Sequence, residues 1–422
     1  MRIAIISLHT SPYTALGTGD GGGMNVVVRE TAESLGQLGQ LGHRVELFTR
    51  RDDPETPDVV EMAPGVRLHT LDAGPAKPLP KSRIDDYLDQ FTHGLRRRVG
   101  ELAAMAEPVE LIHSHHWMSG VAALPVAREL GVPHLLSYHS VAAEPGHPLS
   151  EGEPPESPRR LPGEALIARE SDLIVAVSKA EARTVIERCG ADPARIAVLH
   201  PGVDTNLFRP IAPGETSWRC CDMGRPFVLF AARLQPLKGP DLALEALARI
   251  DPQVRPHLVI AGEVSADFAD YHSEIERLAH GLGVAGDVIY SGSRPRAEFA
   301  AMMRSARLIL VPSHSETFGL VALEGAASGV PVIASAAGGL IESVEDGRTG
   351  IIVPTRDPQD WADAISRLLT DRQEHERLSF GGLARVQGQD WLTASARLAE
   401  LYATHIATSA APAPAHHGET GR

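Results

Sequence analysis

Two basic and two acidic residues in the second half of the chain have the types and spacing needed to hold a nucleotide diphosphate sugar. Arg233 follows a predicted strand and Lys238 precedes a predicted helix, so both cations can face a diphosphate at the helix start. Glu316 and Glu324 stand eight positions apart in an apolar stretch that argues against a solvated face. The pattern predicts cations at the pyrophosphate, one carboxylate at the ribose and one near the sugar. Solvent-exposed loop charges are the alternative, and the joint occurrence of both pairs argues against it.

A glycine-rich segment near the start of the chain is a second candidate for anion binding. Gly17, Gly19 and Gly22 follow the first predicted strand with G-x-G-x-x-G spacing and precede a helix, whose first amides carry partial positive charge. A plain flexible turn is the alternative. The motif also occurs in dinucleotide-binding folds, but the second strand ends at Arg50 and Arg51, without the acidic residue that holds the ribose of NAD. An NADP-dependent oxidoreductase is therefore the alternative enzyme class, against which the cations and carboxylates of the second half argue.

Histidines cluster in the first half of the chain at His113, His115 and His116, and His139 follows a later strand. A metal site is one interpretation, but no acidic or cysteine partner stands at ligand spacing, so packed or acceptor-side histidines are favoured. The sequence also lacks a D-x-D pair, with which other sugar-nucleotide enzymes hold a divalent cation. We therefore expect cationic side chains to neutralise the diphosphate, with no metal and no cofactor.

Short apolar runs alternate with amphipathic stretches through most of the chain, which is typical of parallel strands covered by helices on both faces. The pattern stops at a segment rich in Pro and Gly and then restarts. We therefore expect an α/β fold with two Rossmann-like, doubly wound domains that face each other across a cleft, over residues 1–205 and 206–385. A helix over 386–406 that packs back on the first domain and a disordered tail over 407–422 complete the prediction.

The same pattern gives the expected elements. Expected strands are residues 3–8, 45–49, 66–70, 111–113, 134–137, 173–177 and 196–199 in the first domain and 227–231, 258–261, 288–290, 308–311, 332–334 and 351–353 in the second. Expected helices are residues 24–35, 84–105, 119–130, 179–188, 241–250, 271–281, 296–305, 320–328, 359–370 and 391–406. Ligands of such folds bind at the carboxyl ends of the strands, which here face the cleft.

The composition argues against several protein classes. The 422 residues carry 40 basic and 54 acidic side chains, and the net charge of −14 would repel a nucleic-acid backbone. No stretch reaches the ~20 apolar residues of a membrane span, and the opening residues lack a secretory cleavage site, so we expect a cytoplasmic protein. Cys189, Cys220 and Cys221 have no C-x-x-C spacing and are expected to be free thiols.

The motifs, taken in order from Met1 to about Ile406, resemble those of the retaining glycosyltransferases of family four, which have the two-domain GT-B fold. Within that family the chain is most similar to the mycothiol-pathway enzymes that transfer N-acetylglucosamine from UDP-GlcNAc to inositol phosphate. The matching segments are Ser7 to Pro12, Gly17 to Asn25, Leu111 to His115, Arg233 to Gly239 and Glu316 to Glu324. The resemblance implies a UDP-sugar and a cyclitol as substrates, with the acceptor on the first domain and the donor on the second, and it leaves a homodimer open.

The resemblance also assigns residues to the donor. It places Gly23 under the diphosphate, with Arg233 and Lys238 on its oxygens. It places Glu324 at the ribose, and Glu316 with His139 at the transferred sugar. The implied donor-binding residues are Gly22, Gly23, Arg233, Lys238, Arg294, Glu316, Phe318, Gly319, Leu320 and Glu324, and the implied catalytic residues are His139, Glu316, Arg233 and Lys238. In such enzymes the acceptor attacks from the face of the leaving group, whose phosphate oxygen takes the proton, so no nucleophilic carboxylate is needed.

The acceptor site follows the family pattern less closely. In the inositol-phosphate enzymes a lysine, a tyrosine, a threonine and an arginine grip the acceptor phosphate. The corresponding residues here, with two others that face the acceptor, are Lys81, His116, Ser140, Arg159 or Arg160, and His9 and Asn25. Because histidine replaces the tyrosine and serine the threonine, an unphosphorylated aminocyclitol is an alternative acceptor. Sucrose or sucrose-phosphate synthesis, and a protein that binds without turnover, are further alternatives.

Overall fold

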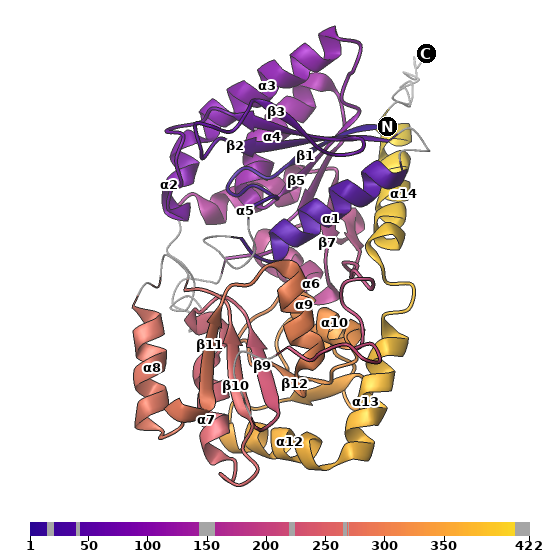
Figure 1. The fold of residues 1–422 in the computed structure, drawn as a ribbon. Helices are drawn as coiled ribbons and strands as arrows, with labels where there is room; N and C mark the ends of the chain where they lie inside the picture. Colours follow the sequence, from indigo (N-terminus) through magenta and orange to yellow (C-terminus); the bar gives the residue numbers. More distant parts are fainter. Residues whose placement is uncertain are drawn as a thin grey trace, which may run out of the picture.

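The structure is a computed structural model that describes residues 1–14, 21–38, 43–142, 157–218, 224–264, 268 and 270–409. These residues form two α/β lobes, one above the other in Figure 1. In each lobe helices cover both faces of a sheet, because strands that are apolar on both sides must be shielded from water twice. The prediction of two doubly wound domains that face each other across a cleft is confirmed.

Within the described residues, the first lobe holds an eight-stranded sheet in the order β3-β4-β2-β1-β5-β6-β7-β8. Neighbouring strands pair in parallel, except that β3 and β4 are antiparallel. The strands are β1 Arg2–Ile6, β2 Arg44–Arg50, β3 Val59–Ala63, β4 Val66–Leu71, β5 Leu111–His115, β6 His134–Ser137, β7 Leu173–Ala176 and β8 Ile196–Val198. The helices are α1 Gly23–Gln37, α2 Lys81–Ile84, η2 Asp85–Tyr87, α3 Leu88–Ala104, α4 Trp117–Leu130, α5 Arg160–Glu170, α6 Lys179–Cys189 and η4 Pro193–Arg195.

The second lobe holds, within the described residues, a six-stranded parallel sheet in the order β11-β10-β9-β12-β13-β14. Its strands are β9 Phe227–Ala231, β10 His257–Ala261, β11 Val288–Gly292, β12 Leu308–Val311, β13 Val332–Ser335 and β14 Gly350–Val353. Its helices are η5 Pro236–Lys238, α7 Pro240–Arg249, α8 Tyr271–Gly281, η7 Ala285–Asp287, α9 Arg296–Ser305, α10 Leu320–Ala327, α11 Leu340–Ser343, α12 Pro358–Thr370 and α13 Arg372–Arg385.

In both sheets the strand order reverses between two central strands, and the loops after these strands carry the predicted site residues. In the first sheet the reversal lies between β1 and β5, and in the second between β9 and β12. A crevice opens where the chain leaves two such strands in opposite directions, which is where open α/β sheets bind ligands. Arg233 and Lys238 follow β9, and Glu316 follows β12, so the sheet order brings them together across a long sequence separation.

Two connections join the lobes and run side by side. Val203 N donates to Gln389 O at 2.9 Å, and the approach is so close that a Cβ on Gly202 would lie 2.5 Å from Trp391 N. The second connection leads into α14 (Trp391–Ser409), which packs along α1 of the first lobe (Figure 1). There the hydroxyl of the fully buried Tyr402 lies 2.7 Å from His113 Nδ1. Residues 410–422 lie outside the described part of the chain.

Several expected elements were wrong in detail. The expected helix 84–105 is interrupted by the 3-10 turn η2, and the first strand ends at Ile6 rather than residue 8. Strand β3 was missed because it is a short edge strand that buries little of its surface. Helix α5 was missed because it begins in an irregular, Pro-rich segment, and α13 because it buries little more than Leu378 and Gly382. In each of these missed elements the apolar repeat is weak, so periodicity did not reveal it.

Candidate active site

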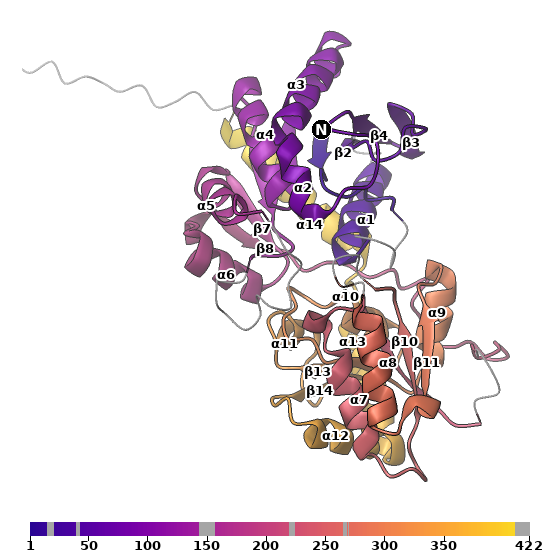
Figure 2. The same ribbon diagram turned by 90° about the vertical axis from the view of Figure 1, so that its left-hand side faces the viewer.

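A cavity of about 490 Å³ lies between the lobes, at the carboxyl ends of the central strands. Helices α1 and α10 both begin at its wall, one in each lobe (Figure 2). They approach so closely that a Cβ built on Gly23 would lie 3.5 Å from Leu320 Cδ1. Because a helix start carries partial positive charge and free amide donors, two of them at one cavity favour an anionic ligand.

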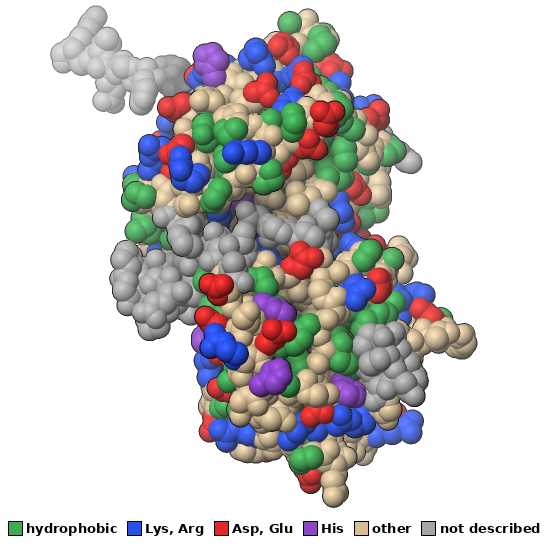
Figure 3. All heavy atoms as spheres, turned by 60° about the vertical axis from the view of Figure 1, so that its left-hand side comes forward, with side chains coloured by type: hydrophobic (Ala, Val, Ile, Leu, Met, Phe, Trp, Pro, Cys, Tyr) green, Lys and Arg blue, Asp and Glu red, His purple; other side chains and the backbone are tan. Residues whose placement is uncertain are grey.

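The charged side chains around the cavity favour the same ligand. On the face shown in Figure 3, basic and acidic side chains are interspersed over both lobes. Among the described residues, the cations that line the cavity outnumber the carboxylates: Lys81, Arg160, Arg188, Arg233, Lys238, Arg294 and Arg296 against Glu181, Glu316 and Glu324. A chain with a net charge of −14 therefore concentrates positive charge at this place.

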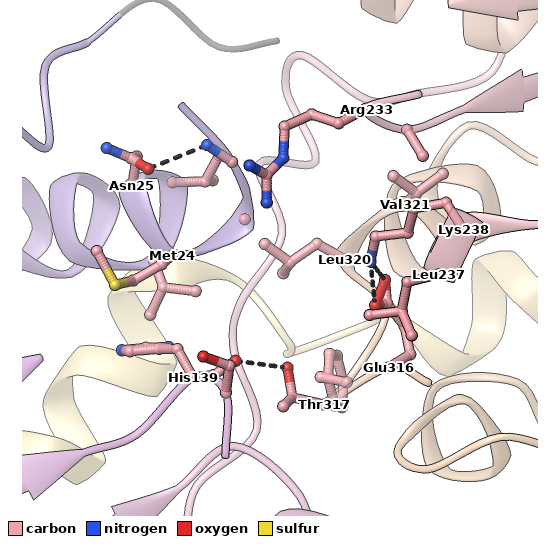
Figure 4. Close-up of a pocket in the computed structure, with 18 of the residues that line it drawn as sticks. Met24, Asn25, His139, Arg233, Leu237, Lys238, Glu316, Thr317, Leu320 and Val321 are labelled. Carbon is pink, nitrogen blue, oxygen red and sulfur yellow. Dashed lines mark hydrogen bonds and ion pairs between the residues drawn. The ribbon is translucent and has the colours of Figure 1, made fainter. Parts of the chain in front are cut away.

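Lys238 and Glu316 form an ion pair at the cavity wall (Figure 4). The Lys238 Nζ donates to the two carboxylate oxygens at 2.8 and 2.7 Å. The side chains keep 18% and 20% of their surface exposed, so a ligand can reach both. An ammonium group has a third hydrogen, which this pair leaves for a phosphate oxygen. The sequence predicted that both residues belong to one donor site, but it did not predict that they contact each other.

Arg233 reaches across the cavity toward the start of α1, where Asn25 lies (Figure 4). The Asn25 amide is fully engaged there: Oδ1 accepts from Gly22 N at 3.0 Å, and Nδ2 donates to Thr10 Oγ1 at 3.0 Å and to Ser11 O at 2.7 Å. It therefore holds the glycine turn in place, and its contact with an acceptor stays a prediction. Gly22 and Gly23 line the cavity, whereas Gly17 and Gly19 lie outside the described residues.

The start of α10 can be built only with glycine at position 319. Gly319 has φ +94°, and a Cβ there would lie 2.5 Å from Leu340 Cδ2. On one side of it the buried Phe318 ring stacks at a tilt on His200, with centroids 5.3 Å apart. On the other side Leu320 faces α1. All three predicted donor residues of this turn line the cavity.

Glu324 lies on the buried side of α10, and Arg296 Nη1 donates to its carboxylate at 3.2 Å. Burial raises the pKa of Glu324 to about 7, although the Arg296 charge opposes this shift. Arg294, the third predicted donor cation, lines the cavity nearby and donates to Glu298 at 3.3 Å. The donor from Arg296 does not offset this burial, and the two hydroxyls of a ribose would add donors that stabilise the carboxylate.

For the UDP-sugar donor that the resemblance implies, this pKa predicts that binding of UDP depends on pH. The folded-state pKa of Glu324 is raised, and ribose hydroxyls favour the carboxylate, so binding should release a proton when the pH is below about 7. UDP affinity should therefore rise with pH up to about 7 and level off above it. Calorimetric titrations between about pH 6 and pH 8 will measure this, and Glu324→Gln should remove the component that this carboxyl contributes. An unchanged slope in that variant would contradict the role.

The acceptor side of the cavity is formed by the first lobe. His9 and His116 lie with ring centroids 4.2 Å apart, and Lys81 lines the same wall. No described residue supplies a hydrogen-bond partner for either nitrogen of His116, which is buried, or for Nδ1 of His9. Burial first, and then the neighbouring cations, hold the pKa of both histidines well below the ordinary value. Both rings are therefore neutral, and each can form a hydrogen bond with a polar group of an acceptor substrate.

Of the two candidate arginines, the structure places Arg160 at the cavity and Arg159 away from it. Arg160 is buried, and it donates to Glu164 Oε1 at 2.7 Å and to Ser140 Oγ at 3.3 Å. Arg159 is exposed, does not line the cavity, and donates to Asp85 O at 3.2 Å. Because α5 begins at Arg160, the helix turns the two neighbours in different directions, and the sequence alone could not separate them.

His139 is held in an unusual backbone conformation at the cavity. Its φ of +60° is rare for a residue with a side chain, and such strain is characteristic of functional sites. The carbonyl accepts from Thr317 Oγ1 at 3.2 Å (Figure 4), and ring Nε2 lies 2.7 Å from His115 Nδ1. Burial lowers the pKa of the His139 ring to about 4, so the ring is neutral.

Residues that bridge the lobes were missed by sequence reasoning. Ser178 Oγ donates to Thr317 O at 2.6 Å and accepts from Glu181 N at 2.9 Å. Glu181 lines the cavity, and burial raises its pKa to about 7. The Ser-x-x-Glu spacing of 178 and 181 is a capping-box signal that predicts a helix start. No sequence signal indicated that this helix start contacts the other lobe.

The structure argues against the NADP-dependent oxidoreductase, because Arg50 and Arg51 do not form an anion site. The buried Arg50 donates to the carbonyls of Arg51, Pro75 and Lys77, at 2.8 to 2.9 Å. Arg51 pairs with Asp58 and with Asp72. Both guanidinium groups are thus engaged by the protein itself, which leaves neither poised for a 2′-phosphate.

Other predictions concern the rest of the chain. Cys189 is a buried free thiol whose pKa burial raises to about 12, and Cys220 and Cys221 lie outside the described residues. The described residues contain no group of three side chains that could hold a metal ion. None of the described helices is both long and apolar enough to cross a membrane.

Comparison with known proteins decides the family. Residues 21–207 match the Glycosyltransferase Family 4 model and residues 221–382 match the model for group 1 glycosyl transferases. The D-inositol 3-phosphate glycosyltransferase of Thermobifida fusca is 39% identical over 399 residues, which cover 92% of this chain and 90% of the relative. The chain belongs to the family 4 glycosyltransferases. The D-inositol 3-phosphate glycosyltransferase of Frankia alni is 40% identical over 399 residues, which cover 92% of this chain and 96% of the relative.

Solved structures agree with this membership. The sucrose-phosphate synthase of Thermosynechococcus elongatus superposes with a TM-score of 0.86 and 29% identity over 97% of this glycosyltransferase and 100% of that chain. The Anabaena protein HepE, in complex with UDP-glucose, gives a TM-score of 0.72 at 19% identity over 96% and 100%. The second likeness supports the fold alone. The predicted GT-B architecture and a nucleotide-sugar-dependent glycosyltransferase are thereby confirmed.

Proposed function

We propose that this glycosyltransferase moves N-acetylglucosamine from UDP-GlcNAc to an inositol phosphate, with retention of configuration at the anomeric carbon. Its relatives at about 39% identity carry the name D-inositol 3-phosphate glycosyltransferase. The observation that carries the proposal is that cations from both lobes line the cavity. Arg233 and Lys238 of the second lobe, with the starts of α1 and α10, suit a diphosphate, and Lys81 and Arg160 of the first lobe suit a second phosphate.

The donor part would act on the leaving group. As the bond between the anomeric carbon and the phosphate oxygen breaks, negative charge develops on the diphosphate. Arg233, Lys238 and the first residues of α1 and α10 line the cavity, which supports a role for these cations and amides at the leaving group with little reorganisation. Charge-assisted contacts of this kind stabilise by about 1.5–3 kcal/mol each.

The acceptor would attack from the side that the leaving group occupies. A new bond forms between the acceptor oxygen and the anomeric carbon, and the acceptor proton passes to the departing phosphate oxygen. The carboxylate nearest the donor cations, Glu316, is bound to Lys238, which suits it to hold sugar hydroxyls rather than to attack the anomeric carbon. His139 lines the same cavity, so we assign its neutral ring to the same sugar.

Transfer should not require a divalent cation, because side-chain cations and helix starts neutralise the diphosphate. We expect the enzyme stripped of metal and assayed with EDTA to transfer sugar at a rate within about twofold of the untreated enzyme. A loss of activity that added Mg²⁺ or Mn²⁺ restores would contradict this part of the proposal.

Two features of the acceptor side also suit an acceptor without a phosphate. Arg160 is already bound to Glu164, which weakens its attraction for a phosphate dianion. The neutral His116 stands where the family has a tyrosine and can bond to a polar group that carries no charge. An unphosphorylated aminocyclitol is therefore the second acceptor to test.

Product analysis by mass spectrometry tests the proposal. UDP-GlcNAc, UDP-glucose and GDP-mannose are each combined with inositol 1-phosphate, inositol, fructose 6-phosphate and 2-deoxystreptamine. We expect the largest kcat/KM for UDP-GlcNAc with inositol 1-phosphate, and an α-linked product by NMR. Preferred transfer to 2-deoxystreptamine or to fructose 6-phosphate would replace the acceptor assignment, and an absence of transfer in every combination would overturn the proposal.

A further inference from the structure

A second, smaller cavity of about 30 Å³ adjoins His139, which lines both cavities. Helix α1, strands β5, β6 and β7, the first connection between the lobes and the start of α14 form its other walls. Three of its lining residues carry a buried polar atom for which no described residue supplies a partner: His115 Nε2, Trp391 Nε1 and Ser395 Oγ. Each such atom, if unpaired, would carry the cost of its lost hydration, so three around one space indicate a ligand.

We propose that this cavity is a built site for one internal water molecule, which joins α14 to His115 and thereby fixes the ring of His139. An internal water needs roughly 10–15 Å³ of such space and two to four polar partners, and this cavity offers both. The neighbouring His113 does not compete for the water. Its Nδ1 lies 2.7 Å from Tyr402 Oη, and its Nε2 lies 3.1 Å from Ser137 Oγ.

The proton positions follow from the partners around the water. His115 Nδ1 and His139 Nε2 are 2.7 Å apart, and burial lowers the pKa of both rings, so they share a single proton. The indole nitrogen of Trp391 can only donate. The water can accept two hydrogen bonds, and Trp391 Nε1 uses one of them. If His115 Nε2 also donated to the water, the Ser395 hydroxyl would have no acceptor for its proton there. The water therefore donates to His115 Nε2, and His115 Nδ1 donates to His139.

This arrangement gives His139 one tautomer. Because its Nε2 accepts from His115, the ring carries its proton on Nδ1 and offers a hydrogen-bond donor to the ligand. His115 does not line the large cavity, so it acts as a positioning residue, as partners of metal-binding and catalytic histidines do. The effect on catalysis rests on the proposed function, whereas the water and the tautomer do not.

The first test needs no variant. A crystal structure of the full chain at high resolution should show density in the cavity within hydrogen-bond distance of His115 Nε2, Trp391 Nε1 and Ser395 Oγ. Histidine ¹⁵N NMR should show His139 protonated on Nδ1 and His115 on Nδ1. A dry cavity, or His115 protonated on Nε2, would overturn the proposal even if the enzyme transfers no sugar.

The second test separates positioning from stability. Trp391→Phe keeps an aromatic ring, although a smaller one, and removes the donor, and Trp361→Phe makes the same change at an indole that donates to Thr355 O in the second lobe. We expect kcat to fall about tenfold in Trp391→Phe alone, with a mixed His139 tautomer and UDP affinity within about twofold. His115→Asn, whose amide can replace Nδ1, should retain more activity than His115→Leu. Equal kcat values for the two tryptophan variants, or for the two His115 variants, would contradict the positioning role.

Discussion

Replacing Lys238 by alanine is expected to lower kcat/KM by roughly 1,000-fold, which corresponds to about 4 kcal/mol of transition-state stabilisation. In the proposed mechanism the substitution removes an ammonium group that faces the departing diphosphate. It also leaves the Glu316 carboxylate without its partner at the cavity wall. Both changes make the site less favourable for developing negative charge. Steady-state kinetics and titration with UDP measure the loss, and UDP affinity should also fall.

A matched control distinguishes this role from a general effect of lysine removal. Lys77→Ala removes a lysine that is exposed and does not line the cavity, and it should leave kcat/KM within about twofold. Thermal unfolding should show both variants folded, because a partly exposed ion pair contributes little to stability. A Lys238→Ala enzyme within tenfold of the wild type would contradict the assigned role.

Glu316→Gln is expected to lower kcat about 100-fold while it changes the affinity for UDP by less than about threefold. The amide keeps the shape of the side chain but cannot accept from sugar hydroxyls at both of its terminal atoms, and it no longer neutralises Lys238. UDP has no sugar in that position, so its binding should be little affected. The difference between kcat and UDP affinity separates a contact with the sugar from a contact with the diphosphate.

The control for Glu316 is Glu376→Gln, at an exposed carboxylate of α13 that pairs with Arg372. It should leave both kcat and UDP affinity unchanged. If Glu316→Gln weakens UDP binding as strongly as it lowers kcat, Glu316 acts at the diphosphate and not at the sugar.

The sequence indicated which candidate donor residues would line one cavity, because their positions relative to strands and turns are local features. Arg233 and Lys238 follow one apolar run, Glu316 follows another, and the strand order of a doubly wound sheet places these loops side by side. The ion pair between Lys238 and Glu316 was not predictable, because it depends on the packing of the two loops in space. For the same reason the sequence could not show that Arg160 lines the cavity and Arg159 does not. The first turn of α5 determines the directions of these two side chains.

Contacts between the lobes were beyond sequence reasoning altogether. The hydrogen bonds of Thr317 to His139 and of Ser178 to Thr317 join residues far apart in the chain, and no periodicity records which surfaces of two domains meet. The strained backbone of His139 depends on these contacts and on its neighbours in the fold. The sequence predicted that His139 follows a strand, but it did not predict the backbone conformation of this residue.

The most direct test of the account is a crystal structure of the enzyme with UDP bound. We predict that the β-phosphate lies between the starts of α1 and α10, with Arg233 and Lys238 on its oxygens and the ribose hydroxyls on Glu324. A structure in which UDP occupies the cavity while both cations point into bulk solvent would contradict the claim that this cavity drives departure of the diphosphate.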